Sequence, residues 1–139
     1  MIRVMIAGLG NMGLSHALAH HNHPDAQIVG LVNRTGKVSA PDLQGYPVFT
    51  DFHAALAAVK PDLVVVATYS DSHADSAIAA VEAGADVVVE KPLAPPVQDA
   101  RRVTAKPVEP RHQLGLGLTI PPHPHTVPPT NTAPHRAGP

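Results

Sequence analysis

The sequence contains no cysteine and no tryptophan, and aromatic residues make up only 3% of its 139 residues. Without cysteine the chain can form no disulfide scaffold, Cys-ligated zinc site, iron–sulfur cluster or thiol nucleophile. Cysteine usage therefore leaves the redox compartment open, and the cytoplasm is the default expectation.

The sequence also lacks an excess of either charge, since ten Lys and Arg residues oppose eleven Asp and Glu residues. Binding to nucleic acid or to an anionic membrane through charge needs a basic field, so we expect neither partner. The longest unbroken aliphatic run covers residues 63–67, far short of the roughly 20 residues that span a bilayer. We therefore expect no transmembrane helix, and the glycines that follow residue 7 argue against a signal peptide.

Proline and histidine are abundant, with 16 and 10 residues, and their distribution divides the chain. Residues 106–139 hold nine of the prolines and four of the histidines, and the last acidic residue is Glu109. This shift predicts a folded domain over residues 1–105 and a Pro/His-rich tail over 106–139, in which residues 113–120 could form a sixth strand. Prolines remove backbone donors, so we expect the tail after residue 120 to be disordered. Its composition also fits a shifted reading frame or a truncated protein.

The body of the chain alternates short apolar strands with helical patterns. Strands are predicted over residues 2–7, 26–32, 47–49, 62–68 and 86–89. Helices are predicted after the glycines at 8–13, from Thr50 or Asp51 to Val59, from residues 70–72 with Gly84 after the helix end, and over 97–105. The strand at 62–68 shows no alternation of apolar and polar residues, which is typical of a strand covered on both faces. The pattern predicts βαβ units and hence one α/β domain with a doubly wound parallel sheet, the Rossmann fold.

Three glycines lie between the first predicted strand and the first predicted helix, where such a pattern binds a dinucleotide. Gly8 permits a tight turn, Gly10 lets the backbone approach a pyrophosphate, and Gly13 lets the helix pack closely on the strand. Asn11 and Met12 complete this candidate phosphate site, because the N-terminus of the helix offers free N–H groups. A glycine-rich turn that binds nothing is the alternative.

The end of the second strand indicates which cofactor is preferred. An acid that accepts the ribose hydroxyls of NAD is typical there, but this sequence has Asn33, Arg34 and Thr35. Arg34 can pair with a 2′-phosphate, so the segment favours NADP, with NAD as the other candidate. Two alternatives remain open: Arg34 is a solvated loop charge, or it stacks on an adenine and serves NAD equally.

Three motifs in this order resemble the N-terminal domain of the Gfo/Idh/MocA oxidoreductases, which include glucose-fructose oxidoreductase and inositol dehydrogenase. They are Gly8-Leu9-Gly10-Asn11-Met12-Gly13, Ala67-Thr68-Tyr69-Ser70-Asp71-Ser72-His73 and Ala83-Gly84-Ala85-Asp86-Val87-Val88-Val89-Glu90-Lys91-Pro92-Leu93-Ala94. The resemblance covers residues 1 to about 105 and implies an NAD(P)-binding Rossmann domain. It makes Lys91 the catalytic residue of the active site, counts Glu90 and Lys91 among the cofactor-binding residues, and places Thr68 and His73 in the loop that lines the cofactor. From spacing alone, Glu90 and Lys91 are an adjacent pair of surface charges. Tyr69 and Ser70 replace the family's usual Pro-Asn.

The resemblance also implies a reaction. Family members move a hydride between nicotinamide and a hydroxyl-bearing carbon of a sugar or polyol, and a second domain supplies an Asp and a His. The sequence ends before such a domain, which predicts a truncated chain that is inactive alone. The alternative is a non-catalytic nucleotide-binding regulator, or a subunit that a partner chain completes.

Histidines are the remaining candidates for chemistry. His16 and His20 are four residues apart on the first predicted helix, with His21 and His23 near its end. No acidic residue lies between the pair and no third ligand follows nearby, so we expect no metal site.

Overall fold

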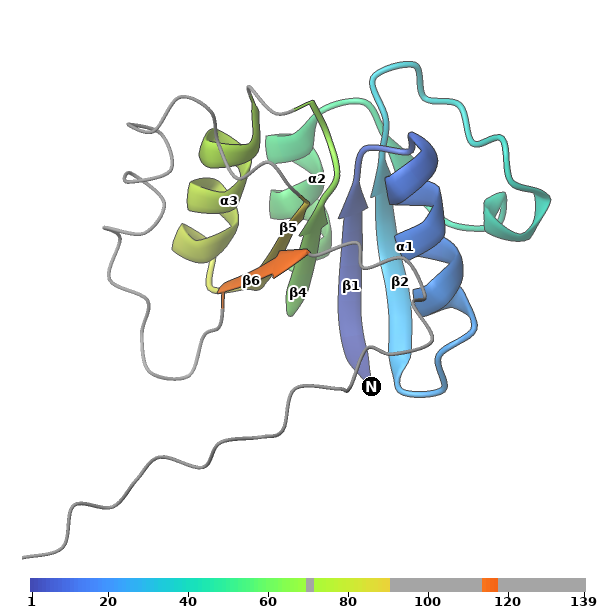
Figure 1. The fold of residues 1–139 in the computed structure, drawn as a ribbon, viewed down its shortest axis with the longest axis horizontal. Helices are drawn as coiled ribbons and strands as arrows, with labels where there is room; N and C mark the ends of the chain where they lie inside the picture. The colour runs from blue at the N-terminus through green and yellow to red at the C-terminus, as the bar shows by residue number, and fades with distance from the viewer. Residues whose placement is uncertain (70–71, 91–113, 118–139) are drawn as a thin grey trace, which may run out of the picture.

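The computed structural model describes residues 1–69, 72–90 and 114–117, and the fold is drawn in Figure 1. Strands and helices alternate along the described chain. Their order is β1 (Ile2–Ala7), α1 (Asn11–His21), β2 (Ala26–Val32), the 3-10 helix η1 (Pro41–Leu43), β3 (Val48–Phe49), α2 (Phe52–Val59), β4 (Leu63–Val66), α3 (His73–Glu82), β5 (Asp86–Glu90) and β6 (Leu114–Gly117).

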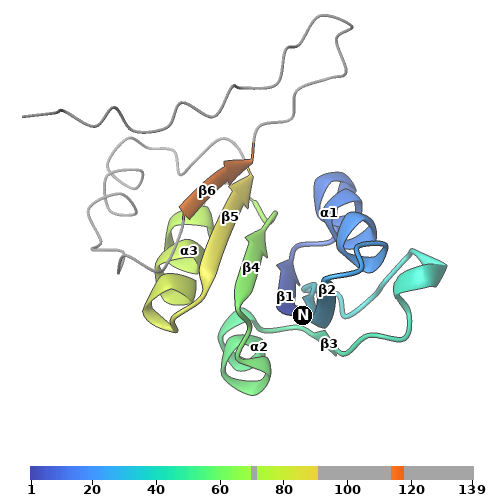
Figure 2. The ribbon, with the colours of Figure 1, turned by 90° about the horizontal axis from the view of Figure 1, so that it is seen from below.

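The strands form one parallel sheet in the order β3-β2-β1-β4-β5-β6. Strand β1 pairs with β2 on one side and with β4 on the other, so the order reverses at β1. Helix α1 covers one face of the sheet, whereas α2 and α3 cover the other (Figure 2). This is the doubly wound α/β arrangement that the alternating pattern predicts. In such a sheet, ligands bind beyond the carboxyl ends of the strands at the point of reversal.

Two apolar clusters hold the helices against the sheet. Met5 and Ala7 of β1 belong to the cluster under α2 and α3, whereas Val4 and Ile6 belong to the cluster under α1. All four side chains are fully buried. Successive strand residues point to opposite faces, so a strand with helices on both sides needs apolar residues at every position. The same division applies to Val64, Val65 and Val66 of β4, which confirms the prediction of a central strand.

Local signals set the ends of the helices. The Oδ1 of Asp51 accepts a hydrogen bond of 2.7 Å from the backbone N–H of Ala54, which caps α2 as predicted. Ser72 is the N-cap residue of α3 and lies within the predicted start. Gly84 follows the end of α3 with a φ of +86°, the left-handed conformation expected there.

The structure adds β6, which pairs in parallel with β5 and lies within the segment 113–120 considered as a sixth strand. The helix predicted over 97–105 and the tail after residue 120 lie outside the described residues. The boundary at residue 105 stays a prediction. None of the helices in the described part of the chain is long and apolar enough to cross a bilayer.

The tightest backbone packing, between α1 and the turn after β1, gives a first prediction. A Cβ at Gly13 would lie 1.8 Å from the carbonyl oxygen of Gly8, so Gly13→Ala forces α1 away from the turn. We expect this substitution to lower the free energy of unfolding by about 1 to 3 kcal/mol or more. Urea unfolding followed by circular dichroism measures it.

Gly45→Ala is the matched control, because a Cβ at Gly45 would have no neighbour within 4 Å. We expect it to change the free energy of unfolding by less than about 0.5 kcal/mol. Equal stability of the two variants would contradict the proposed close contact.

Candidate dinucleotide site

A pocket of about 510 Å³ opens at the edge of the sheet where β1, β2 and β4 end. It lies at the reversal of strand order, the position expected for a ligand site. Its lining combines the glycine turn, the segment after β2, the start of α2 and the segment after β4. The described lining residues are Gly8, Leu9, Gly10, Val32, Asn33, Arg34, Thr35, Thr50, Phe52, Ala67, Thr68, Tyr69, Ser72 and Ser76.

The three glycines differ in what surrounds them. Gly8 has a φ of +89°, and a Cβ there would lie 2.5 Å from the carbonyl oxygen of Ala67. Gly13 has no room for a Cβ beside the Gly8 carbonyl, so both positions require glycine for packing. A Cβ at Gly10 would have no protein atom within 4 Å, although Gly10 lines the pocket. The bare backbone of Gly10 is therefore the part of the turn that a ligand can approach.

Helix α1 begins directly after Gly10, with its N-terminus beside the pocket. Gly10 is the N-cap residue, no side chain caps the helix, and the first turn holds no acidic residue. Asn11 and Met12 occupy that first turn. The first N–H groups of a helix have no partner within the helix, and they carry a partial positive charge. This end of α1 suits an anionic group such as a phosphate.

Asn33 shapes the loop that follows β2. Its Nδ2 donates hydrogen bonds to the backbone oxygen of Lys37, at 2.7 Å, and to the Oγ1 of Thr35, at 3.2 Å. The backbone N–H of Gly36 donates to the backbone oxygen of Asn33 at 2.9 Å, and Gly36 has a φ of +66°. The amide nitrogen of Asn33 is thus used within the loop, and its side-chain oxygen is the part suited to accept from a ribose hydroxyl.

Arg34 carries the only charge among the described residues that line the pocket. Its guanidinium carbon lies 5.2 Å from the centre of the Tyr69 ring, within the range of a cation–π contact. Arg34 follows β2 and Tyr69 follows β4, so the contact bridges the two strands that flank β1. Sequence reasoning identified Arg34 but gave it no partner.

Thr68 and His73 lie at different depths. Thr68 lines the pocket, and its Oγ1 is 2.8 Å from the Oγ of Ser72. His73 is only 2% exposed, and its Nε2 donates to the backbone oxygen of Thr68 at 2.8 Å. His73 does not appear among the described lining residues. His73 therefore holds the segment after β4 from the protein interior, whereas Thr68 lines the pocket.

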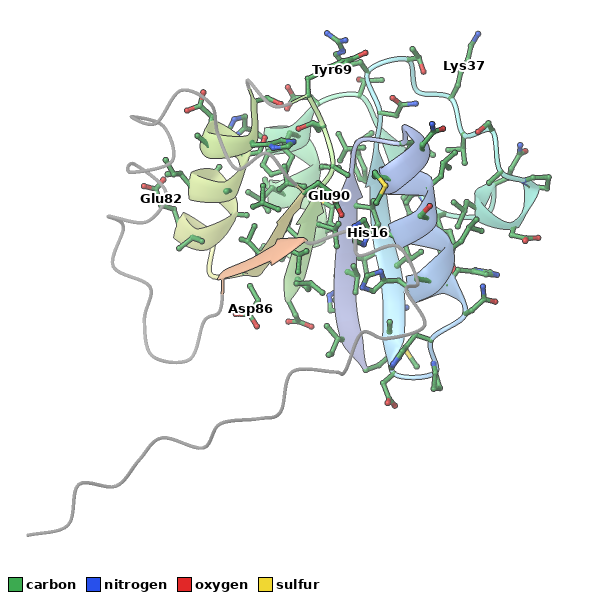
Figure 3. The ribbon with its side chains drawn as sticks, viewed as in Figure 1. His16, Lys37, Tyr69, Glu82, Asp86 and Glu90 are labelled. Atoms are coloured by element: carbon green, nitrogen blue, oxygen red, sulfur yellow. The ribbon has the colours of Figure 1, made fainter. Side chains whose placement is uncertain are left out.

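Glu90 has a partner that the sequence did not reveal. It ends β5, is 6% exposed, and its Oε1 accepts a hydrogen bond from the Nε2 of His16 on α1. The two side chains point toward each other in Figure 3. A buried carboxylate requires a partner, but spacing in the sequence indicates a surface charge at Glu90, and nothing in the sequence selects His16. Lys91 lies outside the described residues.

The other histidines of α1 also have partners. The Nδ1 of His20 donates to the backbone oxygen of His16 at 2.7 Å, and the Nδ1 of His21 is 2.8 Å from the hydroxyl of Tyr46. Over residues 1–69 and 72–90, no three His, Asp or Glu side chains are grouped so that they could hold a metal ion.

Comparisons with known proteins agree with this geometry. The 4-carboxy-2-hydroxymuconate-6-semialdehyde dehydrogenase of Sphingobium sp. is 34% identical over 111 residues, which are 78% of this chain and 35% of that protein. An inositol 2-dehydrogenase of Corynebacterium glutamicum is 30% identical over 106 residues, 73% of this chain and 32% of that protein. GenD2 from gentamicin A biosynthesis, whose crystal structure is a complex with NAD, superposes with a TM-score of 0.75 at 32% identity. That match covers 84% of this chain and 34% of GenD2.

The chain spans about a third of the length of these relatives. Residues 2–117 match the family model described as an oxidoreductase family with an NAD-binding Rossmann fold. The match includes the glycine turn, the pocket and every described strand. The chain therefore belongs to the Gfo/Idh/MocA oxidoreductase family and contains its NAD-binding Rossmann domain.

Proposed function

We propose that this chain binds NADP in preference to NAD and forms the cofactor-binding domain of an oxidoreductase that acts on sugar-like or polyol-like substrates. The observation that carries the cofactor preference is the charge of the pocket. Its described lining holds one cation, Arg34, and no carboxylate. NAD-binding sites of this fold use an acid at the end of the second strand, where this chain has Asn33.

The cofactor would lie across the carboxyl edge of the sheet. Gly8 and Gly13 shape the turn, and the pyrophosphate would approach Gly10 and the N-terminal turn of α1, at Asn11 and Met12. The open space at Gly10 supports this placement, because a side chain there would occupy the path of the ligand.

The adenosine end would lie toward the loop after β2. Asn33 offers a side-chain oxygen to a ribose hydroxyl, and Arg34 offers N–H groups to a 2′-phosphate. Thr68 would contact the cofactor from the loop after β4, where it lines the pocket, with His73 holding that loop from beneath. Glu90, paired with His16, would fix the end of β5 from which Lys91 follows.

The preference for NADP can be measured by titration calorimetry. A charge-assisted pair between Arg34 and a 2′-phosphate is worth about 1.5 to 3 kcal/mol, so NADP should bind roughly ten- to a hundred-fold more tightly than NAD. Arg34→Ala should abolish this difference while leaving the affinity for NAD nearly unchanged. Equal affinities in the wild-type chain, or tighter binding of NAD, would refute the preference.

Lys37→Ala is the matched control for Arg34→Ala. Lys37 is an exposed cation on the same loop, its side chain extends away from Tyr69 in Figure 3, and it is not among the described lining residues. The backbone oxygen that receives the Asn33 hydrogen bond is retained in this variant. A loss of NADP affinity equal to that of Arg34→Ala would indicate general electrostatic attraction in place of a specific pair.

The proposed reaction is the one that the family resemblance implies. A bound nicotinamide supplies a site that accepts or donates a hydride. Lys91 would orient the hydroxyl of the substrate. As the hydride leaves the carbon, the hydroxyl proton must pass to a base, a role that the family resemblance gives to the Asp and His of the second domain. The substrate class rests on the resemblance and on the relatives, among them inositol 2-dehydrogenases.

We expect the 139-residue chain to bind the cofactor without turning over a sugar or polyol. Hydride transfer requires the reacting carbon to be held within about 3.5 Å of the nicotinamide. In the family a second domain holds the substrate in this position, and the chain covers about a third of the length of its relatives. Loss of this orientation raises the activation free energy by roughly 7 kcal/mol or more, which lowers the rate on the order of a hundred-thousand-fold.

The absorbance of reduced cofactor, followed with a panel of inositols and aldoses, tests this expectation. No turnover is expected alone, and turnover should appear when a substrate domain is fused to the chain or added. Steady turnover by the chain alone that Lys91→Ala abolishes would overturn the proposal of an incomplete catalyst. A fused protein that binds NADP but stays inactive on every substrate would favour the non-catalytic regulator.

A further inference from the structure

We infer that Tyr69 contributes to cofactor selectivity by positioning Arg34: its ring holds the guanidinium at the mouth of the pocket, in place to receive a 2′-phosphate. This inference rests on the proposed function and deepens it. Tyr69 would act through Arg34 and would not itself bind the phosphate.

The first argument is the geometry of the two strands that carry the pair. Arg34 follows β2 and Tyr69 follows β4, which pair with opposite edges of β1. The two outer strands of such a trio are about 9 to 10 Å apart, so the contact spans the end of β1. The glycine turn lies directly between them, because it follows β1. The Arg34–Tyr69 contact therefore crosses the pocket beside the turn proposed to bind the pyrophosphate.

The second argument is that the backbone of Tyr69 is firmly held although its side chain is 71% exposed. The backbone oxygen of Tyr69 accepts two hydrogen bonds from Ser72, from the N–H at 3.0 Å and from the Oγ at 2.9 Å. The preceding Thr68 accepts a hydrogen bond from the buried His73. The anchored backbone gives the exposed ring a fixed point of attachment, from which it makes the contact with Arg34.

The third argument is energetic. A free arginine side chain has many rotamers, and ordering it on a ligand reduces affinity. A ring beneath the guanidinium limits those rotamers before the ligand arrives, which is pre-organisation. The attraction acts between the charge of the guanidinium and the face of the ring, so it needs no N–H···O hydrogen bond. The N–H groups with which Arg34 would pair with a phosphate are therefore not used up in hydrogen bonds by this contact.

The test compares NADP and NAD affinities in Tyr69→Ala and Tyr69→Phe. A cation–π contact at an exposed site corresponds to about two- to five-fold in affinity, so Tyr69→Ala should weaken NADP binding by that factor. NAD binding should be unchanged, because NAD has no 2′-phosphate. Tyr69→Phe keeps the ring and should retain the selectivity of the wild-type chain.

A double-mutant cycle separates positioning from direct contact. If Tyr69 acts through Arg34, then Tyr69→Ala should have no further effect on NADP affinity once Arg34 is Ala. If Tyr69 stacked on the adenine, the substitution would weaken NADP and NAD equally in both backgrounds, which would overturn the inference. An unchanged selectivity in Tyr69→Ala would overturn it as well.

The same titrations distinguish this inference from the proposed function. A wild-type chain that binds neither dinucleotide would overturn the proposed function and the inference together. A chain that prefers NADP through Arg34, with the same preference in Tyr69→Ala, would overturn only the role of Tyr69. The free energies of unfolding of all variants should lie within about 1 kcal/mol of the wild-type value, because an exposed cation–π contact contributes no more than that.

Discussion

The contact between Gly13 and the backbone of Gly8 is the constraint on which the site depends. Because no Cβ fits there, α1 lies directly against the turn that follows β1. The turn is closed on its other side by Ala67, whose carbonyl oxygen leaves no room for a Cβ at Gly8. The N-terminus of α1, the end of β1 and the segment after β4 are thereby fixed relative to one another. The proposed phosphate site is the space that this packing leaves open at Gly10.

Much of the fold could be predicted because its signals are local. The run Val64 to Val66 lacks alternation, which indicates a central strand whatever lies on its two faces. Asp51 caps a helix through an N–H three residues away. Gly84 permits a left-handed conformation two residues after the end of α3. Each of these features depends on neighbours in the sequence, so a single chain without an alignment was sufficient to identify them.

The partners of the site residues could not be predicted, because they come from distant parts of the chain. His16 and Glu90 are 74 positions apart and meet because α1 packs near the end of β5. The sequence places His16 four residues from His20 and predicts no metal site there. It makes Arg34 a candidate for binding a 2′-phosphate but does not reveal Tyr69, which contacts Arg34 because the order of the sheet places the end of β4 near the end of β2. Strand order is a property of the whole sheet, and no local pattern encodes these pairs.

The described site combines two kinds of contact that respond differently to substitution. Glu90 is buried and paired, so removal of either partner leaves a polar group without its hydrogen bond inside the protein. Arg34 and Tyr69 are exposed, and their contact adds little to the stability of the fold. A contact of about 1 kcal/mol is nonetheless worth about five-fold in ligand affinity.

The two contacts contribute to different free energies. The free energy of unfolding includes contributions from the whole core, whereas the difference in binding free energy between two cofactors depends only on the groups that distinguish them. NADP and NAD differ by one phosphate, so under the proposed function a single exposed arginine and its supporting ring would decide between them. Cofactor preference would then change at these two loop positions while the buried packing of β1, α1 and β4 remains the same.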